Sequence, residues 1–148
     1  MAIGDICKRA VIVVEAEHSV RVAAALMRDQ HVGTLVVVRN NGTCRPIGIV
    51  TDRDIVIGVV AVGLDPEVLT VGDIMGQRFF TAPEDQGVLE TVRQMRREGI
   101  RRLPIVDRDG ALIGIVTLDD LLGLLAGELG ELAGLLAREQ AIEEKTRR

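Results

Sequence analysis

Aromatic residues are nearly absent from this sequence. It contains neither Trp nor Tyr, and its two Phe residues are the neighbours Phe79 and Phe80. Proteins that bind single-stranded nucleic acid usually stack bases on several aromatic side chains. Positive charge is also limited. The 18 Lys and Arg residues are outnumbered by 22 Asp and Glu residues, which gives a formal net charge of −4. Phosphate-backbone binding depends on clustered positive charge, so nucleic acid is disfavoured as the main partner.

Cysteine and histidine are equally sparse. The two cysteines, Cys7 and Cys44, have no CxxC or metal-type spacing and form no disulfide framework, so we expect a reduced, cytoplasmic protein. His18 and His31 have no partner at metal-ligand spacing, and no metal site is predicted.

Long hydrophobic runs are missing as well. The longest, at 55–64 and 121–127, fall well short of the ~20 residues that span a bilayer. The N-terminal MAIGDICKRA has no apolar core before a cleavage site, so no signal peptide and no membrane association are expected. Ser-His-Asp, Cys-His and P-loop patterns and a paired general acid and base are also missing, so we do not expect an enzyme.

What the sequence does contain is an internal repeat. GIVTDRD at 48–54 returns as GIVTLDD at 114–120, and GDICKR at 4–9 returns as GDIMGQ at 72–77. The offset is 68 residues up to a polar turn and 66 residues after it, because the second turn is two residues shorter. Two homologous units of this kind predict a repeat architecture within the 148 residues.

Each unit predicts the element order β-α-β-β-α. Apolar stretches at 10–14 and 79–81 indicate the first strands, and helices with apolar residues at i, i+4 and i+7 follow from Val20 and from Val88. Two β-branched runs joined by a Gly-containing turn then predict a hairpin in each unit. A second helix starts after Thr51 and after Thr117.

The strands are continuous apolar runs, which predicts that both sheet faces are covered. The second helix of unit one, IVIGVVAV, is apolar nearly all round, which is typical of a buried helix. We therefore expect an α/β (α+β) fold in which two repeats pack with pseudo-twofold symmetry, plus a C-terminal helix. The expected segments are repeat 1 at 4–64, a linker at 65–71, repeat 2 at 72–127, and a C-terminal helix with a frayed tail at 128–148.

The repeated T-x-x-D has two readings. As a capping box, Thr51 and Thr117 begin a helix, and Asp54 and Asp120 reach back to the cap's N–H. As a ligand site, the hydroxyl and carboxylate project together from a strand-to-helix junction, where a carboxylate can accept from both hydroxyls of a ribose diol. The two readings are compatible.

The tandem order, together with GIVTDRDI, GIVTLDDL, two GDI openings and RRLPIVD, resembles the cystathionine β-synthase (CBS) domain family, whose two-repeat unit is often called a Bateman module. The resemblance covers about residues 4 to 127. It implies regulatory binding of adenosine-containing ligands in clefts between the repeats, with AMP, ADP and ATP most expected, and no required cofactor.

The resemblance also implies roles for particular residues. Ribose would be held by Thr51 and Asp54 and by Thr117 and Asp120. Phosphate would be held by Arg101 and Arg102, for which a solvated rim is the plainer alternative. Weaker candidates for the adenine contacts are Val11, Ile12, Phe79 and Phe80. Unit one has Gly33 and Thr34 in place of the arginine pair, so one stronger and one weaker or empty site are expected.

The C-terminal segment carries Leu125, Leu129, Leu132 and Leu136 at near-heptad spacing. This stripe favours a subunit interface over a helix that folds back on its own module, and members of the resembled family commonly form dimers. We therefore expect a homodimeric regulatory module that signals to an effector protein. The competing hypotheses are a ligand-free dimerisation or interaction module, in which T-x-x-D only caps helices, and a small enzyme that uses the cleft.

Overall fold

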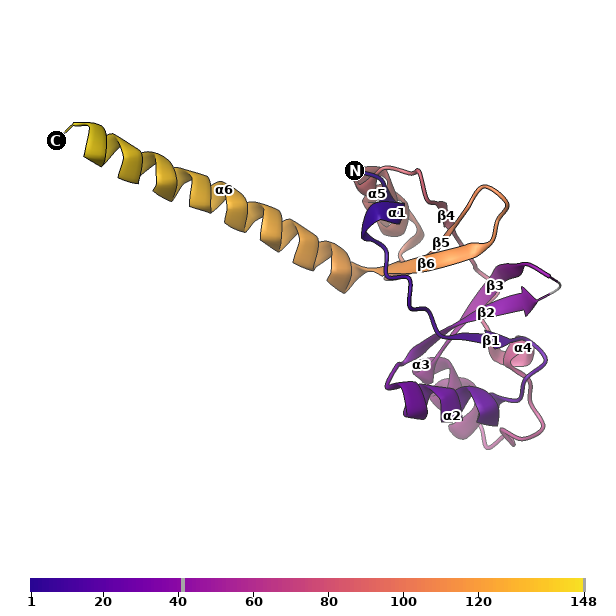
Figure 1. Ribbon diagram of the computed structural model, residues 1–148. Coiled ribbons are helices and arrows are strands. Elements are labelled where there is room, and N and C mark those ends of the chain that lie inside the picture. The colour runs from indigo at the N-terminus through magenta and orange to yellow at the C-terminus, as the bar shows by residue number, and fades with distance from the viewer. Residues whose placement is uncertain (41, 148) are drawn as a thin grey trace. The chain divides into compact units, whose positions relative to one another are not determined.

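The computed structural model describes residues 1–40 and 42–147 (Figure 1). The chain divides into two compact units, Met1–Val116 and Thr117–Arg148, which are considered separately below. The first unit holds nearly all of both repeats, and the second consists of one long helix. The fold is mixed α and β with two three-stranded sheets, as the repeat pattern predicts.

The first sheet has the order β1-β2-β3. Strand β1 (Val13–Glu15) pairs in parallel with β2 (Thr34–Asn40), which pairs antiparallel with β3 (Cys44–Thr51) and carries a bulge between Val37 and Val38. The four residues from Leu35 to Val38 are each at most 2% exposed. Side chains of successive strand residues point to opposite faces, so both faces of β2 are covered, as its continuous apolar run predicts.

The second sheet repeats this arrangement with β4 (Ala82–Pro83), β5 (Arg102–Val106) and β6 (Leu112–Thr117). The prediction of a strand at 79–81 is wrong, because β4 starts only at Ala82, opposite Ile105. The carbonyl of Thr81 instead accepts a hydrogen bond from the Gln94 side chain at 3.1 Å. The chain therefore joins the sheet one residue later than the apolar run suggests.

The first helix of each repeat is α2 (Val20–Gln30) and α5 (Val88–Glu98). Ser19 caps α2 by accepting from the backbone N–H of Val22 at 3.2 Å. Both helices end on a left-handed residue, His31 with φ 54° and Gly99 with φ 67°. His31 therefore occupies the helix-ending position that glycine usually takes.

The short helices that open the two repeats are exchanged between them. Helix α1 (Ile3–Ile6) docks on the second repeat, where the N–H of Gly4 donates to the carbonyl of Glu84 at 2.9 Å. Helix α4 (Val71–Ile74) docks on the first, where the N–H of Gly72 donates to the carbonyl of Ala16 at 2.9 Å (Figure 1). Each repeat is thus completed by a segment that precedes the other repeat in the sequence.

The second helix of the first repeat consists of α3 (Asp52–Ile55) and a π-helical turn η1 (Val56–Val60). The prediction that this apolar segment is buried is wrong for the isolated chain. Val59 is fully buried, whereas Val56 is 56%, Ile57 51% and Val60 67% exposed. One side of the segment completes the core of its own repeat, and the other side lies on the surface of the unit.

The second unit is the single helix α6 (Leu118–Thr146), in which the predicted second helix of repeat 2 and the predicted C-terminal helix run together without a break. Thr117 caps it. Most of its leucines are exposed, including Leu125, Leu129, Leu132 and Leu136 at 47% to 65%.

Candidate functional site

Both copies of T-x-x-D form complete capping boxes. The N–H of Thr51 donates to Asp54 Oδ2 at 2.9 Å, and the N–H of Asp54 donates to Thr51 Oγ1 at 3.2 Å. The Thr117 and Asp120 pair has the same two bonds at 3.1 and 3.2 Å. The helix-start reading of the motif is therefore correct, and a ligand role has to come in addition to it.

A third capping box shows that capping geometry alone does not identify a ligand-binding site. Thr70 and Asp73, which begin α4, make the same reciprocal bonds at 2.9 and 3.3 Å. Asp73 is not among the residues that line the pocket described next. What distinguishes Asp54 is its surroundings.

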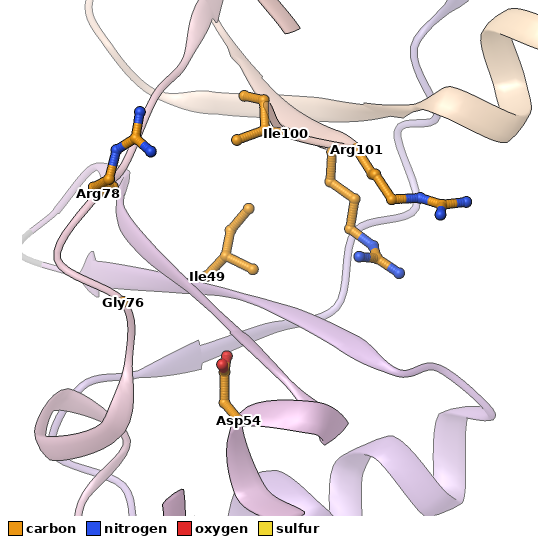
Figure 2. Close-up of a pocket in the computed structure, with 7 residues that line it drawn as sticks. Ile49, Asp54, Gly76, Arg78, Ile100 and Arg101 are labelled. Atoms are coloured by element: carbon orange, nitrogen blue, oxygen red, sulfur yellow. The ribbon is translucent and has the colours of Figure 1, made fainter. Parts of the chain in front are cut away.

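Asp54 lines a pocket of about 270 Å³ between the two repeats of the first unit (Figure 2). The other lining residues are Ile49, Gly76, Arg78, Ile100, Arg101 and Arg102. They come from β3, from the segment after α4, and from the first residue of β5 and the two residues before it. Asp54 points into the pocket from α3, and Arg78 and Arg101 extend from opposite sides of it. Three of the six ribose and phosphate candidates, Asp54 on one repeat and Arg101 and Arg102 on the other, thus line the same pocket.

The pocket combines one carboxylate with three guanidinium groups, so the formal charge of its lining is positive. Asp54 is half-buried, and its Oδ1 accepts no hydrogen bond from the residues that the structure describes. This oxygen is the one that the capping box leaves available. An anionic molecule with hydroxyl groups would satisfy both the carboxylate and the arginines.

Arg78 is a pocket residue that the sequence did not single out. Its guanidinium lies 3.4 Å from Glu98 Oε2 and 5.5 Å from the centre of the Phe80 ring, which holds it at the edge of the pocket. Ile49 and Ile100 were also missed. Each directly adjoins a singled-out feature, since Ile49 is the second residue of GIVT and Ile100 precedes the arginine pair.

The four residues proposed for adenine do not line this pocket. Val11 and Ile12 are half-buried, and Ile12 packs against the core of the first repeat. Phe79 and Phe80 are half-buried beside Arg78. The apolar walls of the pocket are Ile49 and Ile100 instead. Thr117 and Asp120 begin the second unit, where they cap α6.

Cys7 lies over the second copy of the repeated motif, since a Cβ added at Gly114 would meet Cys7 Sγ at 2.5 Å. Burial raises the pKa of this thiol, and the nearby Arg9 guanidinium opposes the shift. Among residues 1–40 and 42–147, no group of three or more His, Cys, Asp or Glu side chains could hold a metal ion. None of the helices in these ranges is long and apolar enough to cross a membrane.

The thiol of Cys7 is expected to react with iodoacetamide at pH 8 more slowly in the native protein than in urea, because its raised pKa lowers the thiolate fraction. The folded state also holds the proton more tightly, so the free energy of unfolding should fall as the pH rises through the usual thiol range. Mass spectrometry of peptides from pulse-alkylated protein measures the first effect, and equal rates in both states would contradict it.

These features define a class of protein with two β-α-β-β-α repeats and a basic pocket between them. The chain belongs to the CBS domain family, because the sequence profile of the CBS domain matches residues 3–60 and 71–127. It is a pair of CBS domains, which is a regulatory module.

Three comparisons illustrate this membership. An uncharacterized protein of Methanopyrus kandleri is 43% identical over 122 residues, which cover 82% of this chain and 61% of that protein. The chain therefore spans less than two thirds of that relative. The crystal structure of hypoxic response protein I, which holds two coordinated zinc ions, has a TM-score of 0.71 at 30% identity and covers 82% of this chain and 97% of that one.

The third is the crystal structure of the CBS domain pair of protein MJ0100 in complex with 5-methylthioadenosine and S-adenosyl-L-methionine. Its TM-score is 0.73 at 26% identity, with 86% of this chain and 98% of that chain covered. A pair of CBS domains with this fold thus accommodates adenosine-containing ligands.

Proposed function

We propose that this protein is a regulatory sensor that binds an adenosine-containing ligand of the AMP, ADP or ATP type in the pocket around Asp54. The observation that carries the proposal is that Asp54 lines one pocket together with Arg101 and Arg102, which belong to the other repeat. A ligand held by both repeats stabilises one arrangement of them to the extent of its differential affinity. The binding state can then be passed to a partner.

In this proposal each part of the ligand has its own contacts. The free oxygen of Asp54 accepts from the ribose hydroxyls while Thr51 keeps the helix start in place. Arg101 and Arg102 meet phosphate, and the apolar side chains of Ile49 and Ile100 contact the base. The bound ligands of the MJ0100 pair support the adenosine moiety, and the positive lining supports phosphate.

Thr117 and Asp120 remain proposed as the ribose pair of a second, weaker site. The residues of the first repeat that correspond to the arginine pair are Gly33 and Thr34, which carry no charge. Uncharged residues provide no electrostatic attraction for phosphate of the kind that Arg101 and Arg102 provide. We therefore expect one nucleotide per chain to bind tightly.

The direct test is a thermal shift of ligand-free protein with AMP, ADP, ATP, NAD, NADH and S-adenosylmethionine in turn. Ligands that bind only the native state raise its stability in proportion to the logarithm of their concentration over Kd. We expect the nucleotides to raise the melting temperature. The absence of a shift with every compound would overturn the proposal.

Neutralising the arginine pair, as Arg101→Ala with Arg102→Ala, is expected to weaken AMP binding about three- to tenfold and to leave adenosine binding unchanged. Both side chains are exposed, so solvent and salt screen their attraction for phosphate and keep the effect moderate. Isothermal titration calorimetry measures both affinities. Arg93→Ala with Arg96→Ala, which removes two exposed charges from α5, is the matched control and should change neither affinity.

A ligand-free interaction module is the second candidate function. The capping boxes favour it, because helix initiation alone accounts for Thr and Asp in both motifs. The thermal shift series separates the two candidates. We further propose that the protein acts as a cytoplasmic homodimer without catalytic activity or a required cofactor, and that it signals to an effector protein. Steady conversion of a bound nucleotide would contradict the non-catalytic assignment.

The exposed leucines of α6 are one surface available for the homodimer. Sedimentation of the chain with and without residues 128–148 tests their part in it. We expect the shortened chain to dimerise more weakly, and an unchanged mass would show that this segment does not join subunits.

A further inference from the structure

Arg78 is the third arginine of the pocket, and it lies apart from the other two. Arg101 and Arg102 are neighbours in the chain, whereas Arg78 belongs to the segment after α4. Its side chain extends from the opposite side of the pocket from Arg101 (Figure 2). A phosphate group that the arginine pair binds on one side therefore leaves Arg78 without a phosphate contact on the other.

The positive charge of the pocket exceeds what one phosphate group requires. A phosphate monoester carries a charge of about −1.5 to −2 at pH 7, which two guanidinium groups balance. Arg101 and Arg102 supply these two charges, and Asp54 is the proposed partner of the ribose. The positive charge of Arg78 is surplus for a monophosphate, and it matches the additional negative charge of a diphosphate or triphosphate.

Within the protein, Arg78 is paired with a carboxylate that a ligand could replace. Its Nη2 lies 3.4 Å from Glu98 Oε2, whereas bonds between charged groups of this kind are usually about 2.7–2.9 Å long. The Arg78 side chain is 73% exposed, and ion pairs exposed to water contribute little to stability. The other oxygen of Glu98 accepts from Arg97 Nε at 3.1 Å. Glu98 can therefore release Arg78 and still keep one arginine partner.

The Phe80 ring contacts the same guanidinium, with its centre 5.5 Å from the Arg78 Cζ atom. This cation–π contact does not involve Glu98, so it holds the guanidinium at the edge of the pocket while one anion replaces the other.

The pair of Arg78 and Glu98 is also specific to this pocket. At the 68-residue offset of the repeat, Arg78 corresponds to Ala10 and Glu98 to Gln30. The first repeat thus lacks both members of this pair, as it lacks the arginine pair. Such co-occurrence is expected when the arginine, its carboxylate partner and the arginine pair act on one ligand.

We propose that Arg78 is the residue by which the pocket distinguishes nucleoside diphosphates and triphosphates from monophosphates, and that Glu98 competes with the ligand for it. This inference rests on the proposed function and names the ligand class of the same pocket. A monophosphate is held by the arginine pair and leaves Arg78 bound to Glu98. The outer phosphates of ADP or ATP reach Arg78 and displace Glu98, which stays bonded to Arg97.

Isothermal titration calorimetry with adenosine, AMP and ATP tests the role of Arg78. The buffer contains no magnesium, because Mg²⁺ binds the outer phosphates and reduces their charge. Arg78→Gln is expected to weaken ATP binding about threefold to fivefold and AMP binding less than about twofold, the moderate size reflecting solvent screening of an exposed charge. Adenosine binding should not change. Thermal melts check that each variant is folded.

Arg21→Gln is the matched control for this variant. Arg21 forms an exposed ion pair with Glu67 at 3.1 Å, and neither residue is among those that line the pocket. The variant removes one arginine from an exposed ion pair, as Arg78→Gln does, and it should leave the ratio of ATP to AMP affinity as in the wild type.

A double-mutant cycle tests the competition by Glu98. Glu98→Gln removes the competing carboxylate and should tighten ATP binding about twofold to threefold, an effect that solvent screening keeps small. In the Arg78→Gln background the same change should have no effect on ATP binding, because Glu98 acts through Arg78. Glu67→Gln is the matched control and should leave ATP binding unchanged.

The outcomes separate this inference from the proposed function. Equal losses of ATP and AMP affinity in Arg78→Gln, or a loss of adenosine affinity, would overturn the role of Arg78 in phosphate recognition. An equal gain from Glu98→Gln in both backgrounds would overturn the competition, because Glu98 would then act as a general charge. A wild type that binds none of the nucleotides would overturn the proposed function, and this inference with it.

Discussion

Replacing Asp54 by Ala is expected to weaken AMP binding by about tenfold to a hundredfold. Hydrogen bonds to a charged group contribute about 1.5–3 kcal/mol, and Asp54 is the carboxylate in a pocket otherwise lined by arginine and apolar residues. Adenosine binding should fall by a similar factor, because the proposed partner of Asp54 is the ribose, which both ligands carry. Isothermal titration calorimetry with both ligands measures the change.

The variant also removes a helix cap, so its effect on binding has to be separated from its effect on folding. Loss of a capping side chain costs about 1 kcal/mol of stability. Asp73→Ala is the matched control, because Asp73 makes the same capping bonds and does not line the pocket. Both variants should melt at a lower temperature, and only Asp54→Ala should lose affinity for AMP. Equal affinities in the two variants would show that Asp54 is a cap and no more.

Replacing Gly114 by Ala is expected to lower the free energy of unfolding by about 1–3 kcal/mol, as overpacking of a core does. A Cβ at this position would lie 2.5 Å from Cys7 Sγ and 2.8 Å from the carbonyl oxygen of Lys8. The second contact is with backbone, which is fixed because Lys8 and Ile115 exchange two hydrogen bonds of 2.9 Å. The exchanged N-terminal segment would have to move away from β6.

Gly48, which corresponds to Gly114 in the first copy of the motif, provides a comparison for the stability cost. A Cβ at Gly48 would meet Met75 Sδ at 2.7 Å, and its next contacts belong to the same flexible side chain. Met75 can rotate away, so Gly48→Ala should cost less than about 1 kcal/mol. Urea unfolding followed by circular dichroism measures both variants. A Gly48→Ala cost as large as that of Gly114→Ala would contradict the assignment of the penalty to backbone.

Repetition of sequence made much of the fold predictable. The 3.6-residue spacing of apolar positions placed α2 and α5, and the β-branched runs around a glycine turn placed both hairpins. The prediction failed at 79–81, because the bulky apolar pair Phe79 and Phe80 is not opposite a strand, whereas Ala82 is. Apolar character promotes burial, but pairing with a neighbour decides where a strand begins.

The pocket was predictable only in part. Asp54, Arg101 and Arg102 each carry a local signal, in the T-x-x-D motif or in the arginine pair before Leu103 and Pro104. Arg78 carries none, because its place depends on the exchange of α4 onto the first repeat, which brings the following segment to the pocket. That exchange rests on backbone hydrogen bonds, which any residue except proline can donate.

The sequence by itself determined the tandem repeat, the order of strands and helices within each repeat, and the two predicted capping boxes, because periodicity and short-range hydrogen bonds depend only on residues near one another in the chain. Only the tertiary structure decided which repeat each opening helix completes, which copy of T-x-x-D shares a pocket with the arginine pair, and which side of the α3–η1 segment is exposed. These outcomes depend on contacts between residues tens of positions apart, and the same apolar residues can be buried within a chain or against a second one.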